Sequence, residues 1–116
     1  MNAIPLNVKQ IFLRKAINMV TVNVKSATGD VATVKELIIE GLKEERKRIG
    51  FALERTNSLI KTYEEKYGIS TTAFIEKFRK GEIEETDETF DWWAEMKLAN
   101  ALQEKIKTIE DIEICQ

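Results

Sequence analysis

The sequence predicts a mainly α-helical protein: a long antiparallel helical hairpin with a short intervening helix and one or two short terminal strands. Three observations predict this fold class. The stretches 33–67 and 87–109 repeat apolar residues every three or four positions, as amphipathic helices do. The stretches 20–24 and 111–115 instead change toward a period of two, which is typical of strands. A third of the 116 residues are charged, which favours a folded protein in water over a membrane span.

The first eighteen residues form a basic N-terminal extension. Residues 1–29 carry four basic side chains and no acidic one. Lys9, Arg14 and Lys15 interrupt the apolar residues at the N-terminus, so this segment lacks the uninterrupted apolar core of a signal peptide. Two interpretations stay open for residues 1–18: a segment that is disordered or not native, and a basic helical arm that docks on the acidic C-terminal third.

Met19 directly precedes the first predicted strand, so translation that begins at Met1 and translation that begins at Met19 are both compatible with the sequence. Residues 19–116 are predicted to be a single helical domain, because a chain of this length builds one modest core.

The long helix is expected over residues 33–67. Thr33 followed by Glu36 matches a capping box, in which each side chain satisfies a free backbone N–H at the helix start. The apolar stripe is wider than one other helix can cover, which predicts a homodimer. The residues expected to form the dimer contact are Ile38, Leu42, Ile49, Ala52, Leu59 and Tyr63.

Turn signals follow this helix. Gly68 is expected to end it in a left-handed conformation, and Ser70 or Thr71 to cap a short helix over 71–80. Thr86 or Asp87 is expected to cap the third helix over 87–109. The positions expected to pack against the long helix are Phe90, Ala94, Leu98, Ala101, Leu102, Ile106 and Ile109.

The residue inventory argues against catalysis. The chain has no histidine, which removes the commonest general base and the commonest transition-metal ligand. Its single cysteine, Cys115, is predicted to be an incidental thiol in a reducing cytoplasm. The acids of segment 82–91 match no calcium-loop spacing. The sequence therefore predicts a cytoplasmic protein that is not an enzyme and has no metal and no cofactor.

A protein-binding surface is predicted where acidic and aromatic residues meet. Residues 81–116 carry a net charge of −8. Trp92 and Trp93 are neighbours, so on a helix they point about 100° apart and one of them should face outward. An exposed aromatic residue rimmed by carboxylates has the composition of a hot spot for a basic protein. The residues expected to contact that partner are Trp92, Trp93, Phe90, Asp87, Glu88, Asp91 and Glu95.

A resemblance to a family of small archaeal and bacterial antitoxin-like proteins rests on the segment Lys66-Tyr-Gly-Ile-Ser-Thr-Thr-Ala-Phe-Ile-Glu-Lys-Phe78, followed by Gly81-Glu-Ile, an acidic loop and Phe90-Asp-Trp-Trp-Ala-Glu95. In that family a long charged helix ends in a KYG-S-x-x-F elbow, and an acidic F-x-W segment opens the last helix. The resemblance covers residues 34–110. It implies a partner protein encoded nearby, a ribonuclease-like toxin that this chain would neutralise, and it supplies no catalytic residue.

Two other classes stay open. A ribbon-helix-helix repressor is suggested by a strand that precedes a helix, because such strands pair between two chains and enter the major groove of DNA. The unbroken stretch 33–67 argues against the two short helices which that fold requires. A structural, oligomeric helical protein is the third class.

Overall fold

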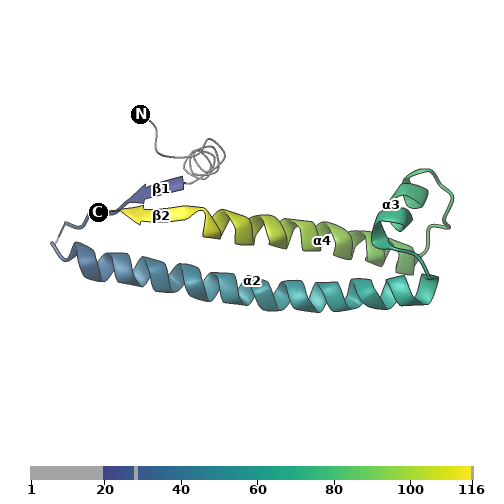
Figure 1. Ribbon diagram of the computed structural model, residues 1–116, viewed down its shortest axis with the longest axis horizontal. Coiled ribbons are helices and arrows are strands. Elements are labelled where there is room, and N and C mark those ends of the chain that lie inside the picture. Colours follow the sequence, from purple (N-terminus) through teal and green to yellow (C-terminus); the bar gives the residue numbers. More distant parts are fainter. Residues whose placement is uncertain (1–19, 28, 116) are drawn as a thin grey trace, which may run out of the picture. The chain divides into compact units, whose positions relative to one another are not determined.

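The computed structural model describes residues 20–27 and 29–115, and three helices and two short strands make up this part of the chain (Figure 1). Helix accounts for 74% of it, and the predicted helical hairpin with short strands is confirmed. The elements in order are β1 (Val20–Asn23), α2 (Val31–Tyr67), α3 (Thr71–Arg79), α4 (Asp87–Glu110) and β2 (Ile112–Cys115).

The described residues group into two compact units. The first, here called the sheet unit, holds residues 20–44 and 107–115; the second, the helical unit, holds residues 45–106. Helices α2 and α4 each contribute to both units. The basic extension and both candidate start residues lie outside the described residues, and the single domain over 19–116 stays a prediction.

The start of α2 differs from the sequence prediction. The helix begins at Val31, and Asp30 caps it: its carboxylate accepts the Thr33 backbone N–H at 3.1 Å and the Thr33 hydroxyl at 2.7 Å. The prediction that Thr33 caps this helix was therefore wrong. The carboxylate of Asp30 accepts both hydrogen bonds, and these bonds hold its pKa below the ordinary value. Thr33 lies three residues into the helix as a donor.

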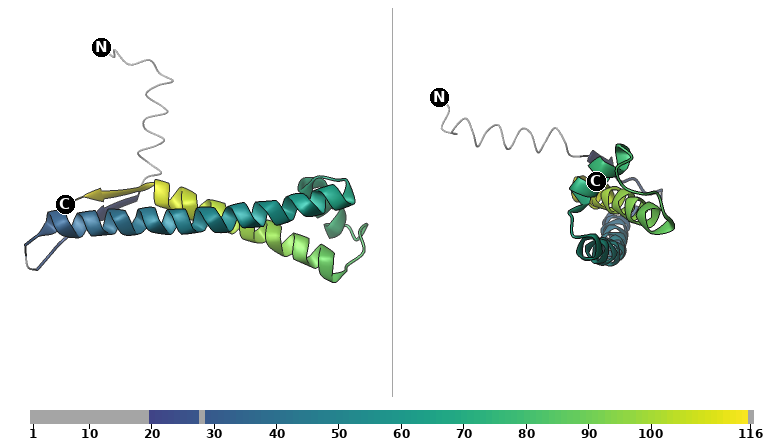
Figure 2. Two further views of the ribbon diagram at one scale, coloured as in Figure 1. Left: turned by 90° about the horizontal axis from the view of Figure 1, so that it is seen from below. Right: turned by 90° about the vertical axis from the view of Figure 1, so that its right-hand side faces the viewer.

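The sheet unit contains a two-stranded parallel sheet (Figure 2). Val20 is opposite Ile112 and Asn23 is opposite Cys115, so the two predicted terminal strands pair with each other. Val24, directly after β1, is buried at 7% exposure, whereas all four residues of β1 are exposed.

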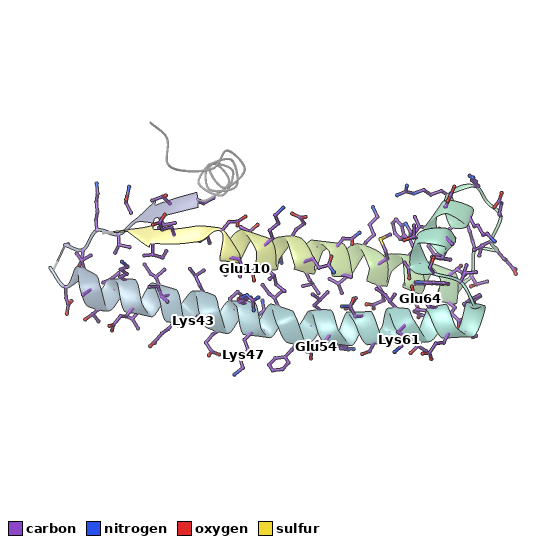
Figure 3. The ribbon with its side chains drawn as sticks, viewed as in Figure 1. Lys43, Lys47, Glu54, Lys61, Glu64 and Glu110 are labelled. Carbon is purple, nitrogen blue, oxygen red and sulfur yellow. The ribbon has the colours of Figure 1, made fainter. Side chains whose placement is uncertain are left out.

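The helical unit carries most of the buried core. Ile49 and Thr56 of α2 are buried at 3% exposure each, and Phe74 of α3 and Trp92 of α4 are completely buried. The side of α2 that faces solvent bears charged residues such as Lys47 and Glu54 (Figure 3). Packing of α2 with α4 follows the ordinary pattern of an apolar stripe on each helix.

The predicted stripe of α4 is correct only in its second half, where Leu102 is buried and Ile106 and Ile109 are half-buried. Phe90 and Leu98 were expected to be covered, yet they are 47% and 46% exposed. The buried residues before Leu102 are instead Thr89, Trp92 and Ala99. The large indole of Trp92 determines which side of α4 is buried, because it buries more apolar area than Phe90 or Leu98 would.

Candidate protein-binding surface

The elbow between α2 and α3 positions the start of the candidate surface. Gly68 has a φ of +69°, a left-handed conformation that a side chain would disfavour, and it ends α2 as predicted. Ser70 then caps α3, with its hydroxyl oxygen accepting the Ala73 N–H at 3.1 Å. The chain therefore reverses within a few residues and places Phe74 beside the end of α2.

Trp92 is the centre of the helical unit. Its ring stacks on Phe74 with ring centroids 3.8 Å apart and an interplanar angle of 5°. Tyr63 and Tyr67 of α2 lie 5.7 Å and 5.4 Å away on the same centroid measure. The indole N–H donates to the Thr71 hydroxyl oxygen at 3.0 Å. A buried tryptophan needs such a partner for its N–H, so Trp92 joins all three helices.

Glu64 completes this arrangement. One of its carboxylate oxygens accepts the Thr71 backbone N–H at 2.8 Å and the Thr71 hydroxyl at 2.9 Å. The Thr71 hydroxyl thus donates to Glu64 while accepting from Trp92, which uses its single proton and one lone pair. The short helix α3 is fastened to α2 and α4 by this chain of hydrogen bonds.

The first turn of α4 is fixed by two threonines. The Thr86 hydroxyl oxygen accepts the Thr89 N–H at 3.1 Å, and the Thr86 N–H donates to the Thr89 hydroxyl oxygen at 2.8 Å. This reciprocal cap confirms that Thr86 caps the helix. Because Thr89 is buried at 2% exposure, the cap also sets which face of α4 turns inward.

Glu88 binds to its own chain. Its carboxylate accepts the Lys66 ammonium at 2.7 Å and the Tyr67 hydroxyl at 2.5 Å. The bond from Lys66, then that from Tyr67, holds the pKa of Glu88 below the ordinary value. The same bonds raise the pKa of Lys66 and of Tyr67. Glu88 is therefore already paired.

Negative charge gathers on α4 beside Tyr63. Burial raises the pKa of the Tyr63 hydroxyl, and the charges of Asp91, Glu88 and Glu95 raise it further. Glu95 is half-buried, and its Oε2 atom is buried with no hydrogen-bond partner among the described residues. These carboxylates make the start of α4 strongly anionic.

The outward side of α4 forms what we call the acidic-aromatic face: Asp87, Phe90, Asp91 and Trp93. Phe90 is 47% exposed and meets Phe78 edge-on, with ring centroids 5.6 Å apart. Asp87 and Asp91 beside it are exposed. Trp93 is half-buried, and the ammonium of Lys97 lies 4.9 Å from its ring centroid. At about 100° per residue, these four positions follow one another around the helix axis in the order Trp93, Phe90, Asp87 and Asp91 within about 160°, so they lie on the outward half of α4, with Trp93 and Asp91 at its two borders.

The structure sorts the seven residues expected to contact a partner. Asp87, Phe90, Asp91 and Trp93 come together on the acidic-aromatic face. Trp92 has no exposed surface at all, so it supports this face from inside and offers nothing to a partner in this conformation. Glu88 and Glu95 lie at the inner border of the face. The expectation that one of the two tryptophans points outward holds for Trp93, in part.

The residues expected to form a dimer contact are spread over both units. Ile49 is buried at 3% exposure within its own chain, and Ile38, Leu42, Ala52 and Tyr63 are half-buried. Leu59 is the exposed member, at 39%. Tyr63 lies beside Trp92 of its own chain.

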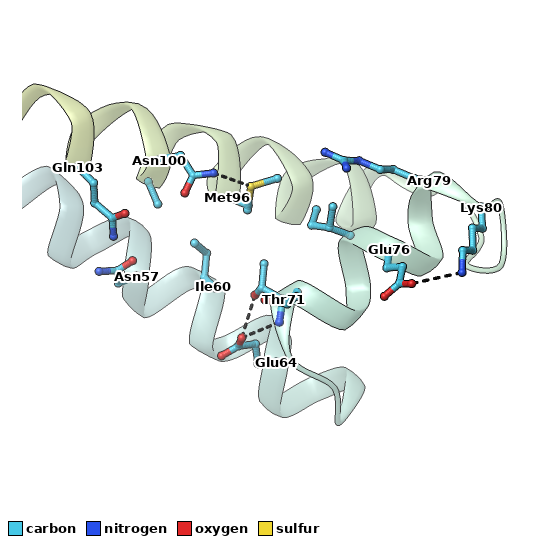
Figure 4. A pocket seen from close by; sticks show the side chains of 13 residues that line it. Asn57, Ile60, Glu64, Thr71, Glu76, Arg79, Lys80, Met96, Asn100 and Gln103 are labelled. Atoms are coloured by element: carbon cyan, nitrogen blue, oxygen red, sulfur yellow. Dashed lines mark hydrogen bonds and ion pairs between the residues drawn. The ribbon is translucent and has the colours of Figure 1, made fainter.

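An open groove of about 650 Å³ lies within the helical unit, between α3 and the facing parts of α2 and α4 (Figure 4). Sequence reasoning did not find it, because its walls come from three separate helices. Ile60, Ile75 and Met96 are among its apolar lining residues, and Arg79, the last residue of α3, and Lys80, which follows it, also line the groove. The volume falls in the range of small-molecule sites, but the mixed lining selects no particular ligand.

In the described part of the chain, no three His, Cys, Asp or Glu side chains lie where they could hold a metal ion together. None of the described helices is long and apolar enough to cross a membrane.

Comparison of the chain with protein-family models, with curated proteins and with solved structures finds no match. The resemblance to antitoxins stays a prediction from sequence motifs.

Proposed function

We propose that this chain is a non-catalytic, cytoplasmic protein-binding module whose acidic-aromatic face takes a basic protein partner. The observation that carries the proposal is Phe90. It remains 47% exposed beside Asp87, with Asp91 beyond Asp87 around the helix and both carboxylates exposed, although the aromatic cluster of the same unit lies directly beside it.

The composition of the face explains the choice of a basic protein. A half-exposed phenylalanine gives a partner an apolar contact, and surrounding carboxylates give lysine or arginine side chains their counter-charges. Residues 81–116 have a net charge of −8, so the same region repels the phosphates of a nucleic acid. Attraction of a positive protein surface would raise the association rate at low salt.

The finer form of the proposal is that the partner is a basic, RNA-directed toxin encoded beside this chain, which would act as its antitoxin. The motifs from Lys66 to Trp93 support this form by resemblance. An enzyme that acts on RNA presents a positive surface to its substrate, and an anionic protein can cover that surface by charge complementarity. Self-association as a homodimer belongs to the same proposal.

The test is to purify the products of the adjacent reading frames and measure their binding to this chain by calorimetry at two salt concentrations. We expect one basic product to bind, with weaker binding at high salt. Phe90→Ala should weaken the complex at least about 10-fold, as loss of a hot-spot residue does, and Asp91→Lys should slow association. Glu54→Lys, an exposed charge reversal on α2, is the matched control and should bind normally.

Co-expression adds a functional readout. If the bound product stops growth when expressed alone, this chain should restore growth, and the Phe90→Ala variant should restore it less. Trp92→Ala is unsuitable here because it would damage the core. Binding of no adjacent product, together with a shift of operator DNA at physiological salt, would contradict the proposal and favour the ribbon-helix-helix alternative.

A further inference from the structure

The sheet unit contains an incomplete sheet. Its two strands are parallel, and among the described residues no third strand pairs with either of them. Parallel sheets are normally covered on both faces, and a two-stranded ribbon is at best marginally stable in water. An additional strand would complete the sheet.

The free edge of β1 can be assigned from the ladder. The Val20 N–H donates to the Asp111 carbonyl at 2.8 Å, and Val20 is opposite Ile112 in the register. Along a strand the backbone groups point alternately to the two sides, so the N–H and C=O groups of Thr21 and Asn23 point away from β2. Val20 and Val22 are 52% and 37% exposed.

The two strands also differ in exposure. The side chains of Ile112 and Ile114 in β2 are half-buried, whereas all of β1 is exposed. In Figure 1, β1 is the outer strand and β2 lies on the side nearer α2. Among the described residues no strand occupies the outer edge of β1, so an added strand can pair there.

We propose that the outer edge of β1 pairs antiparallel with β1 of a second copy of this chain, about a twofold axis at Val22. In this register Thr21 lies opposite Asn23 of the second copy, and the two pairs related by the axis exchange four backbone hydrogen bonds. Val22 lies opposite its own equivalent, and Val20 lies opposite Val24. The result is a continuous four-stranded sheet in the order β2, β1, β1, β2.

The side chains of β1 suit a copy of themselves. Residues 20–24 alternate valine with Thr21 and Asn23, so the twofold register puts valine against valine on one face and polar against polar on the other. The segment carries no charge, so pairing with itself brings no like charges together. A strand of a basic partner would find no carboxylate on β1 to pair with. The strand that pairs with this edge is therefore β1 of a second copy.

In this proposal the two copies meet through β1, apart from the α2 residues that the sequence suggests as a dimer contact. The contact uses none of the residues of the acidic-aromatic face, so it would form whether or not that face binds a basic protein. The contact is isologous, since the same edge serves both chains.

Cysteine crosslinking tests the register in the full-length chain. Cys115 lies opposite Asn23 in the ladder, so it is first replaced by Cys115→Ser. Val22→Cys in this background should form an interchain disulfide under mild oxidation, because non-hydrogen-bonded antiparallel pairs bring Cα atoms to about 4.5 Å. Val20→Cys is the matched control: the two copies of residue 20 would be about 13 Å apart, beyond disulfide reach.

Sedimentation equilibrium supplies the second readout. The parent chain should reach twice its 13.4 kDa mass at high micromolar concentration. Thr21→Pro removes an outward N–H and leaves the inward ladder of β1 intact, so it should give a monomer with unchanged helical circular dichroism. Thr21→Ser should still dimerise. A monomeric parent chain, equal crosslinking at positions 20 and 22, or a dimeric Thr21→Pro variant would overturn the proposal.

Discussion

The two units of this protein differ in how completely their interiors are closed. Of the eight buried residues among those described, seven belong to the helical unit, and Val24 alone belongs to the sheet unit. In the helical unit Trp92 has aromatic contacts and a satisfied N–H. In the sheet unit the valines of β1 are exposed, and among the described residues no strand pairs with the backbone groups on its outer edge.

Because of this difference, the two units are expected to be stabilised in different ways. The helical unit obtains its stability from its own side chains, since burial of a large aromatic residue contributes a few kcal/mol. The sheet unit has too little buried apolar surface to match that contribution, so its order should depend on what joins its free edge. Mutations in the two units should therefore respond differently to protein concentration.

The largest effect is expected from Trp92→Ala. Removal of a completely buried indole should lower the free energy of unfolding by about 3–5 kcal/mol, measured by urea denaturation with circular dichroism. The loss should be the same at all protein concentrations, because Trp92 lies within one chain. Trp93→Ala is the matched control. Trp93 is only half-buried, so the loss should stay below about 2 kcal/mol. Similar losses for both variants would show that Trp92 is not the centre of the unit.

Thr71→Val should have the next largest effect. The change keeps the shape of the side chain but leaves the Trp92 indole N–H without its acceptor, and Glu64 loses one donor. An unsatisfied buried polar group costs about 1–3 kcal/mol, so the unfolding free energy should fall by that amount. Thr71→Ser keeps the hydroxyl and should cost less than about 1 kcal/mol. If serine were as harmful as valine, the methyl group and not the hydroxyl would be responsible.

The sequence was sufficient to predict the helices but not their exact faces. The long stretch of α2 and the break at Gly68 are local signals, and both were predicted correctly. The start of α2 was misplaced because Asp30 and Thr33 are both good capping residues. The face of α4 was predicted correctly at Leu102 but misplaced in the first half of the helix, because Phe90 and Leu98 are more apolar than Thr89 and Ala99, which the fold buries.

The candidate surface was predictable only in part. Composition indicated that acidic and aromatic residues meet on α4. Which of the two adjacent tryptophans is buried could not be predicted without knowing that Phe74 stacks on Trp92. A spacing signal existed, since Trp92 continues the series from Thr89 to Met96 and Ala99 at intervals of three and four. The contact between Glu64 and Thr71 spans a turn and depends on the geometry of the elbow.

The smallest effect is expected from Glu88→Gln, read as a function of pH. The pKa of Glu88 is lowered in the folded chain by Lys66 and Tyr67, so its ionised form favours folding. That contribution is present above the ordinary pKa of 4.5 and is lost as pH falls through the lower, folded value. The parent chain should be slightly more stable than the variant near pH 7, and the difference should vanish in acid. A difference that grows in acid would contradict the pairing.

Amide hydrogen exchange followed by NMR at several protein concentrations tests the contrast between the two units most directly. Protection of Trp92 and its neighbours in the helical unit should not change with concentration. The Thr21 and Asn23 amides should exchange fast when dilute and slowly when concentrated, because in the proposed dimer the second copy supplies their acceptors. Fast exchange of both amides at every concentration would contradict this account of the sheet unit.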